Sequence, residues 1–219
     1  MNIGYSFKNK KLLDIAMTHI SYANEKGVES NQRLEFLGDS ILSLIVSEYI
    51  YCEFSNHDEG RLTEIRAGAV CEKSLADVAK KLRLGDGVKF GKSESACNGK
   101  DKPSILCDTY EAVLGAIYLD GGMDAAKKWV MDNLKEKIQA AQQMDFRNYK
   151  SELQNFFQKR DKGVEVVTYE LIEKSGPDHA PLFKVEATYM GKTIGRGQGK
   201  NRKLADQAAA RDAYEKFVR

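Results

Sequence analysis

The chain has 219 residues, of which 42% are hydrophobic, and a formal net charge of +2. This length allows one large domain or two modest ones, and the hydrophobic share is enough for a folded core. The longest apolar stretches fall short of the roughly 20 residues that a membrane-spanning helix needs, and residues 1–11 lack the apolar segment of a signal peptide. We therefore expect a soluble, cytoplasmic protein with no membrane partner.

The charge is divided unevenly along the chain. Residues 148–219 carry 14 Lys and Arg against 10 Asp and Glu, whereas the preceding residues carry 20 against 22. A basic C-terminal part joined to a slightly acidic one is typical of a protein that binds a polyanion with the first and performs cation-dependent chemistry with the second. The four cysteines show no CxxC spacing, so we expect reduced thiols and no structural zinc.

Apolar residues recur at helical spacing over most of residues 7–143, and no strand pattern of comparable strength is present there. We predict helices at residues 12–16, 34–50, 62–82, 105–119 and 125–141. Pro103 favours the start of the fourth helix, and Asp120-Gly121-Gly122 ends it. Residues 85–102 are rich in glycine and polar side chains, which indicates an exposed loop.

The pattern changes after the polar residues 142–148. We predict a helix at 149–159, strands at 164–173, 182–189 and 192–196, and a second helix at 203–217, whose alanines allow close packing. The sequence therefore predicts an all-α domain at residues 1–144, followed by a small α+β domain of αβββα order at residues 145–219.

Two pairs of carboxylates lie in segments that are otherwise apolar. Glu35 and Asp39 are about 40° apart around a helix, so they point in one direction. Asp108 and Glu111 are about 60° apart and do the same. An ionised carboxylate is costly to remove from water unless a cation or hydrogen bonds compensate it. Four together favour a hard divalent cation, Mg²⁺ or Mn²⁺, because zinc or iron more often recruits His or Cys.

Gly38 and Gly115 lie inside predicted core helices, where a glycine costs about 1 kcal/mol relative to alanine. We expect them to let the two helices cross closely, which would bring the four carboxylates to a common point. The alternative is that the carboxylates are surface salt-bridge partners, with Arg33 and Arg66 as candidate cations. The Glu-x-x-His signature of di-iron bundles is absent.

Three further residues have a structural alternative beside the functional one. His19 follows the first helix, and a lone histidine of this kind is more often a hydrogen-bonded structural residue than a ligand. Glu59 and Glu64 near the start of the third helix could be outer carboxylates of the cation site, or they could simply favour the helix dipole. We favour the dipole interpretation for Glu64.

Basic residues gather at the predicted start of the last helix. Lys200, Arg202 and Lys203 flank Asn201, which we expect to cap the helix while its free N–H groups and the three cations face phosphates. The alternative is a solvated basic helix start. The glycines before this cluster lack the spacing and the βαβ surroundings of a dinucleotide-binding loop.

Two other regions complete a predicted binding face. Gln154 and Gln158 form one polar stripe that is able to reach 2′-hydroxyls and base edges, and His179 lies in a stiff loop, residues 177–181, that could enter a groove. Three contact regions on one face suit the wide, shallow minor groove of A-form RNA. The aromatic side chains nearby fit the core rather than a base-stacking platform, so double-stranded RNA is the expected partner.

Two segments closely resemble the signatures of bacterial ribonuclease III. The first, residues 31–40, reads Asn-Gln-Arg-Leu-Glu-Phe-Leu-Gly-Asp-Ser, and the second, residues 104–112, reads Ser-Ile-Leu-Cys-Asp-Thr-Tyr-Glu-Ala. The C-terminal part resembles a double-stranded-RNA-binding domain, with Gly176-Pro177-Asp178-His179 and the basic cluster at 200–203 in the expected places. The similarity covers essentially the whole chain in family order.

This resemblance implies roles for individual residues. The metal-binding carboxylates would be Glu35, Asp39, Asp108 and Glu111, with Asp39 and Glu111 as the catalytic pair.

The resemblance also reaches residues around these carboxylates. Phe36 would lie at the interface of the family's obligatory homodimer, and Glu59 matches a further acid near the cleft. Gln32 departs from the family, which commonly has Glu at that position. We expect this amide to weaken substrate positioning or an auxiliary metal interaction, with catalysis retained.

The resemblance implies a divalent-metal-dependent endoribonuclease, with Mg²⁺ as cofactor and Mn²⁺ able to substitute. It would cleave double-stranded RNA to products with 5′-phosphates, 3′-hydroxyls and short 3′ overhangs, and act in rRNA and mRNA processing. One alternative is a non-catalytic duplex-RNA-binding or ribosome-associated protein, whose relatives generally lack part of the acidic set. Another is a phosphohydrolase of small nucleotides, which the basic module and the absence of a nucleotide loop disfavour.

Overall fold

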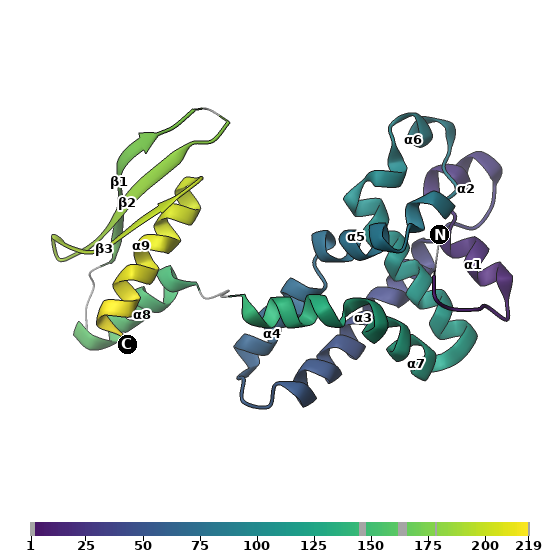
Figure 1. Cartoon of the computed structure of the whole chain (residues 1–219), viewed down its shortest axis with the longest axis horizontal. Coiled ribbons are helices and arrows are strands. Elements are labelled where there is room, and N and C mark those ends of the chain that lie inside the picture. The colour runs from purple at the N-terminus through teal and green to yellow at the C-terminus, as the bar shows by residue number, and fades with distance from the viewer. Residues whose placement is uncertain (1–2, 145–147, 162–165, 178, 219) are drawn as a thin grey trace. The chain divides into compact units, whose positions relative to one another are not determined.

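A computed structural model describes residues 3–144, 148–161, 166–177 and 179–218. The chain divides into two compact units, Met1–Asp145 and Phe146–Arg219. In the described residues, the first unit is built of helices, and the second combines two helices with a three-stranded sheet (Figure 1). The predicted fold class, an all-α domain followed by a small αβββα domain, is confirmed. No described helix is both long enough and apolar enough to cross a membrane.

The helices of the first unit are α1 (Lys10–Ala16), α2 (Ile20–Lys26), α3 (Gln32–Glu53), α4 (Glu59–Ala69), α5 (Glu72–Lys81), α6 (Lys92–Ala96) and α7 (Pro103–Gln143), with 3₁₀ turns η1 (Leu84–Gly87) and η2 (Gly99–Asp101). Helix α7 supplies much of the core, because Val113, Leu114 and Ile117 on one of its faces are fully buried. The predicted break at Asp120-Gly121-Gly122 is a kink within this helical run. Its cause is Gly122, whose φ of 79° lies in the left-handed region that glycine adopts without strain.

The first unit differs from the sequence prediction in three places. The helix predicted at 62–82 is two helices, because Cys71 has an extended backbone (φ −65°, ψ 154°) and starts α5. Both helices bury the same kind of residue, so the apolar pattern continued across the break. Residues 85–102 contain α6 and η2 rather than only loop, and Gly91 is buried against the backbone of Ser21. Helix α2 was not predicted, since its seven residues carry only one fully buried side chain, Ala23.

The second unit consists of α8 (Tyr149–Asp161), β1 (Thr168–Ser175), β2 (Leu182–Tyr189), β3 (Lys192–Gly199) and α9 (Arg202–Phe217). The strands form an antiparallel sheet in the order β1-β2-β3, with Val185 opposite Leu171 on one side and Gly197 on the other. Strand β1 starts at Thr168, later than predicted, and the predicted first residues 164 and 165 lie outside the described residues.

Glycines in β3 set the distance between the sheet and α9. A Cβ atom added to Gly195 would lie 2.3 Å from the carbonyl oxygen of Ala209, and one added to Gly197 would lie 2.1 Å from the amide nitrogen of Ala209. Real Cβ atoms do not approach other atoms this closely, so only glycine allows the backbones to touch. The alanines of α9 provide the matching small surface, as the sequence predicted: Ala205, Ala209 and Ala213 are fully buried. These glycines therefore serve packing.

Candidate active site and RNA-binding residues

The backbones of α3 and α7 touch at the turns that carry the four carboxylates. A Cβ atom at Gly38 would lie 1.8 Å from the carbonyl oxygen of Glu111, and one at Gly115 would lie 2.3 Å from the carbonyl oxygen of Leu34. Each position therefore requires glycine, which explains why two residues that weaken isolated helices occur in the core. The predicted close crossing of the two helices is confirmed.

We call Glu35, Asp39, Asp108 and Glu111 the acidic site. Glu35 and Asp39 lie near the start of α3, whereas Asp108 and Glu111 lie near the start of α7. Asp39 is exposed, and the other three are partly buried.

The pKa values show that the members of the acidic site act on one another. Burial, followed by the charges of Asp39, Asp108 and Glu35, raises the pKa of Glu111 to about 7. Burial also raises the pKa of Glu35, with Asp108 and Asp39 contributing. The pKa of Asp108 is raised chiefly by burial, an effect that His19 opposes. Like charges therefore accumulate at the acidic site.

The ligand atoms of the acidic site suit a hard divalent cation. Among the described residues, ligand atoms of Cys107, Asp108 and Glu111 lie within 4.8 Å of one another, a group that includes Asp108 and Glu111 of the acidic site but not Glu35 or Asp39. The Cys107 thiol donates a weak hydrogen bond to Glu111 Oε1 at 3.9 Å, and burial raises its pKa to about 12, which keeps the thiol protonated at neutral pH. Carboxylate oxygens are the ligands that Mg²⁺ and Mn²⁺ prefer. A bound cation would remove the repulsion among them.

The salt-bridge alternative does not hold for the described residues. Arg33 pairs with Glu29 at 3.7 Å, and Arg66 donates to the hydroxyl of Ser47 at 3.0 Å. None of the ion pairs found among the described residues includes a member of the acidic site. The two candidate cations thus have other partners, and the acidic site keeps its negative charge.

Nearby residues have structural contacts, and Glu64, which lies beyond the first turn of α4, does not have the helix-dipole role predicted for it. His19 caps α2, since its Nδ1 accepts a hydrogen bond from the backbone N–H of Ser21 at 3.2 Å, and burial lowers its pKa. Glu64 forms an ion pair with Arg61 at 3.1 Å. Glu59 is exposed in the first turn of α4 and accepts a hydrogen bond from Thr63, so its role as an auxiliary acid stays a prediction.

A row of exposed apolar side chains runs along α3. Phe36 is 77% exposed, and Leu44 and Tyr51, which fall on the same side of the helix at intervals of eight and seven residues, are 55% and 74% exposed. Large side chains at this exposure on one helix face are typical of a surface that binds another protein. Sequence reasoning had singled out only Phe36.

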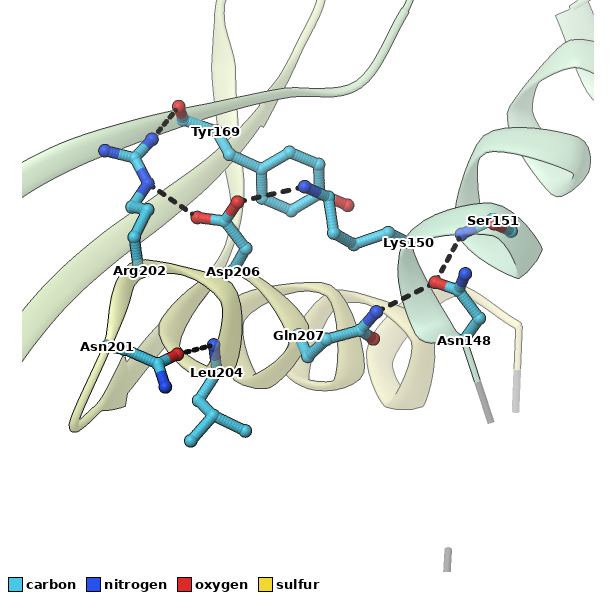
Figure 2. Close-up of polar contacts among 9 residues, drawn as sticks. All are labelled: Asn148, Lys150, Ser151, Tyr169, Asn201, Arg202, Leu204, Asp206 and Gln207. Atoms are coloured by element: carbon cyan, nitrogen blue, oxygen red, sulfur yellow. Dashed lines mark hydrogen bonds and ion pairs between the residues drawn. The ribbon is translucent and has the colours of Figure 1, made fainter. Parts of the chain in front are cut away.

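The predicted RNA-binding residues of α9 differ in their surroundings. Asn201 caps the helix as predicted, because its side-chain oxygen accepts a hydrogen bond from the N–H of Leu204 at 2.9 Å (Figure 2). Lys200 and Lys203 are exposed. The Arg202 side chain is 41% exposed, and its guanidinium is paired, because Nε donates to Asp206 at 2.8 Å. Asp206 was missed, and the predicted contact of Arg202 with phosphate would require Arg202 to leave this pair.

The other predicted contacts lie on α8 and in the loop before β2. Gln154 is partly buried, and its side-chain oxygen accepts a hydrogen bond from the N–H of Val167 at 2.7 Å. Gln158 and His179 are exposed. Gln154 therefore helps to hold the start of the sheet against α8, whereas Gln158 and His179 remain accessible.

Comparisons with known proteins agree with this geometry. A family model described as "Ribonuclease-III-like" matches residues 9–138, and one described as "Double-stranded RNA binding motif" matches residues 149–217. Ribonuclease 3 of Caldanaerobacter subterraneus subsp. tengcongensis is 45% identical over 218 residues, covering 98% of this chain and 95% of the relative. Ribonuclease 3 of Desulforamulus reducens is 44% identical and covers 97% and 87%.

A solved structure is similar to the first unit. The nuclease domain of ribonuclease III from Campylobacter jejuni has 43% sequence identity and a TM-score of 0.58, covering 62% of this chain and 92% of that chain. That structure is described as flexible in the region involved in dimer formation.

Fold, site and matched regions together define a nuclease joined to a domain that binds duplex RNA. The chain belongs to the ribonuclease III family, and it is a ribonuclease III-type endoribonuclease whose partner is double-stranded RNA.

Proposed function

We propose that this endoribonuclease depends on Mg²⁺, which Mn²⁺ can replace, and that the acidic site holds the metal. The observation that carries the proposal is the accumulation of four carboxylates that have no ion-pair partner among the described residues, where burial and the charges of the neighbouring carboxylates raise the pKa of Glu111 and of Glu35. Such an arrangement is unfavourable in the empty protein and becomes favourable when a divalent cation binds.

The residues of the chain divide the work of phosphodiester hydrolysis. Carboxylate oxygens of the acidic site would hold the metal, with Asp39 and Glu111 as the proposed catalytic pair. When bound, the metal supplies an electrophile that offsets charge developing on the phosphate and makes water a better nucleophile. The contact of Gly38 with Glu111 fixes the spacing of the two helices, and so of the ligands that they carry.

We propose further that the products carry 5′-phosphates, 3′-hydroxyls and short 3′ overhangs. Overhangs require two acidic sites that cut opposite strands at offset positions, and a homodimer supplies them. The exposed apolar row of Phe36, Leu44 and Tyr51 supports α3 as the dimer interface. Replacing Phe36 by Asp should shift the protein from dimer to monomer in light scattering; a variant that stays dimeric would exclude this row as the contact.

The two parts of the chain would have separate tasks. We propose residues 1–144 as the nuclease and dimerisation domain and residues 145–219 as the RNA-binding domain, with Gln158, His179, Lys200 and Lys203 as exposed contacts to the duplex. Precursors of ribosomal and messenger RNA are the proposed substrates, because they contain long duplex regions that the RNA-binding domain can grip by shape.

The test is cleavage of a long, labelled RNA duplex by the full chain with Mg²⁺, beside an EDTA control and the Glu111→Gln variant. Short duplexes with 5′-phosphates and 3′ overhangs, formed with Mg²⁺ and by the wild type alone, would support the metal dependence, the role of Glu111 and the proposed product ends. RNA that is bound and left intact by the wild type would favour the non-catalytic alternative and direct attention to Gln32. Blunt products would exclude the dimer geometry.

A further inference from the structure

Asp206 of α9 is a buried carboxylate placed between two cations. Only 8% of the residue is exposed. Its Oδ2 accepts a hydrogen bond from Lys150 Nζ at 2.9 Å, and its Oδ1 accepts one from Arg202 Nε at 2.8 Å, as Figure 2 shows. Both oxygens therefore have a charged donor, which compensates the loss of water around the carboxylate.

Each of the two cations has a second fixed contact on β1. Arg202 Nη2 donates to the carbonyl oxygen of Tyr169 at 2.5 Å, and Lys150 Nζ lies 4.3 Å from the centroid of the Tyr169 ring. A cation over an aromatic ring is attracted by the ring face. Asp206 and Tyr169 thus join α8, β1 and α9, and they restrain both positive charges at fixed contacts (Figure 2).

The neighbouring lysines of the same segment have no such restraint. Lys200 and Lys203 are exposed, and neither side chain has a hydrogen bond or ion pair to another residue that the structure describes. They flank the Asn201 cap at the start of α9, where backbone N–H groups favour anions. The cations near this helix start therefore form two classes, two that face solvent and two that Asp206 holds.

We propose that Asp206 is a positioning residue that limits the affinity of the protein for double-stranded RNA, by holding Lys150 and Arg202 away from phosphates. Their side chains are 36% and 41% exposed, so each lies close enough to the surface to reach solvent once it is released. With Asp206 ionised, the three side chains carry a single net positive charge. Without it they carry two, on long side chains that can follow the RNA backbone.

The experiment measures duplex binding by the full chain and its Asp206→Asn variant, in EDTA to prevent cleavage, over a series of salt concentrations. Every phosphate contact adds about one unit to the slope of log affinity against log salt. The variant should therefore bind about threefold or more tightly at low salt, with a slope about one to two units steeper. Adding either Lys150→Gln or Arg202→Gln to this variant should reduce the salt slope by about one unit.

A matched control separates release of the two cations from a general change of charge. Glu215→Gln removes the same charge from α9 and breaks a pair of the same kind, in which Arg211 Nε donates to Glu215 at 2.9 Å near the other end of the helix. It should keep the slope of the wild type. An equal gain in both variants, or an unchanged slope in a folded Asp206→Asn variant, would overturn the proposal.

The proposal stays testable if Asp206→Asn does not fold, which thermal melting will show. Lys150→Gln in the presence of Asp206 should leave the salt slope at the wild-type value, because the replaced charge is already paired with Asp206. A slope that falls by about one unit would show that Lys150 contacts phosphate and would overturn the proposal. If the wild-type chain binds no RNA duplex, double-stranded RNA is not its partner, and the proposal fails with it.

Discussion

Glu111 and Asp206 are both carboxylates that folding removes from much of the solvent, yet their surroundings are opposite. Glu111 is surrounded by Asp39, Asp108 and Glu35, and together with burial these raise its pKa to about 7. Asp206 receives hydrogen bonds from Lys150 and Arg202. The first carboxylate raises the free energy of the empty protein, whereas the second is compensated within its own unit.

This difference separates a functional carboxylate from a structural one without reference to any relative. A buried charge that the chain does not compensate persists only when something outside the chain compensates it, and a divalent cation has the required charge. A buried charge that the chain does compensate needs no ligand, and its effect is on its neighbours. We therefore expect substitutions at the two positions to have different consequences for activity, stability and binding.

The largest expected effect is the loss of cleavage in Glu111→Gln. The amide keeps the size of the side chain but removes a charged metal ligand. Even the loss of a residue that only hydrogen-bonds to a metal ligand lowers metal affinity or activity by up to about a hundredfold. Cleavage of duplex RNA in Mg²⁺ should fall by more than about a hundredfold, while duplex binding in EDTA stays close to that of the wild type. Loss of both together would mean that the variant misfolds or that the metal bridges protein and RNA.

The second effect concerns the backbone contact beneath the acidic site. In Gly38→Ala, the new methyl group would lie 1.8 Å from the Glu111 carbonyl oxygen, so α3 and α7 must move apart. We expect a loss of about 1–3 kcal/mol of stability, measured by chemical denaturation, together with lower cleavage.

Gly60→Ala is the matched control for this prediction. Gly60 lies in α4, and its added Cβ would meet nothing closer than Asp58 Oδ1 at 3.7 Å. The better helix propensity of alanine should therefore stabilise the protein by up to about 1 kcal/mol. Equal stability of the two variants would show that the helices can separate freely, and would remove the glycine contact as the device that places the ligands.

A third test compares the stability of Glu111→Gln and Asp206→Asn in EDTA. The pKa of Glu111 is about 7 in the folded chain against 4.5 in the unfolded one, so the folded chain binds more protons between these values and its stability falls as pH rises through them. Glu111→Gln should therefore have a higher melting temperature than the wild type. The difference should be largest at pH above about 7 and absent below about 4.5.

Asp206→Asn should do the opposite at neutral pH, since it leaves Lys150 and Arg202 without their anion and should melt below the wild type. Both variants remove one carboxylate charge. If the melting temperature shifts in the same direction in both, the two carboxylates do not differ in their effect on stability. Thermal unfolding with Mg²⁺ supplies the internal check. The metal should stabilise the wild type more than Glu111→Gln.

The fold could be predicted from the sequence to the extent that each element carried its own periodic pattern. The helices at 105–119 and 203–217 and the strand at 182–189 were of this kind. The break at Cys71 was not, because the apolar residues on both sides of its extended backbone continue at helical spacing. Helix α2 is short and buries only Ala23, so its residues carry no periodic signal that a sequence pattern could reveal.

The candidate site could be predicted where chemistry depends on residue type and spacing. The carboxylates and the glycines at 38 and 115 were visible because they interrupt apolar helices. The pairing of Arg202 was not visible, because it depends on Asp206 one turn later together with the carbonyl oxygen of Tyr169, 33 residues earlier in the chain. The i, i+4 spacing of Arg202 and Asp206 was the available signal, and it is common on solvated helices.

The smallest expected effect belongs to Lys203, the exposed counterpart of Arg202. Its ammonium has no ion pair among the described residues and lies in the first turn of α9, so it is free to meet a phosphate. Lys203→Gln should weaken binding to every duplex sequence alike and flatten the salt slope by about one unit. Lys128, which pairs with Asp132 in the first unit, provides the control: Lys128→Gln should change neither quantity. If Lys203→Gln leaves the slope unchanged, Lys203 is a solvated charge that does not contact RNA. The distinction between exposed and paired cations would then not explain RNA binding.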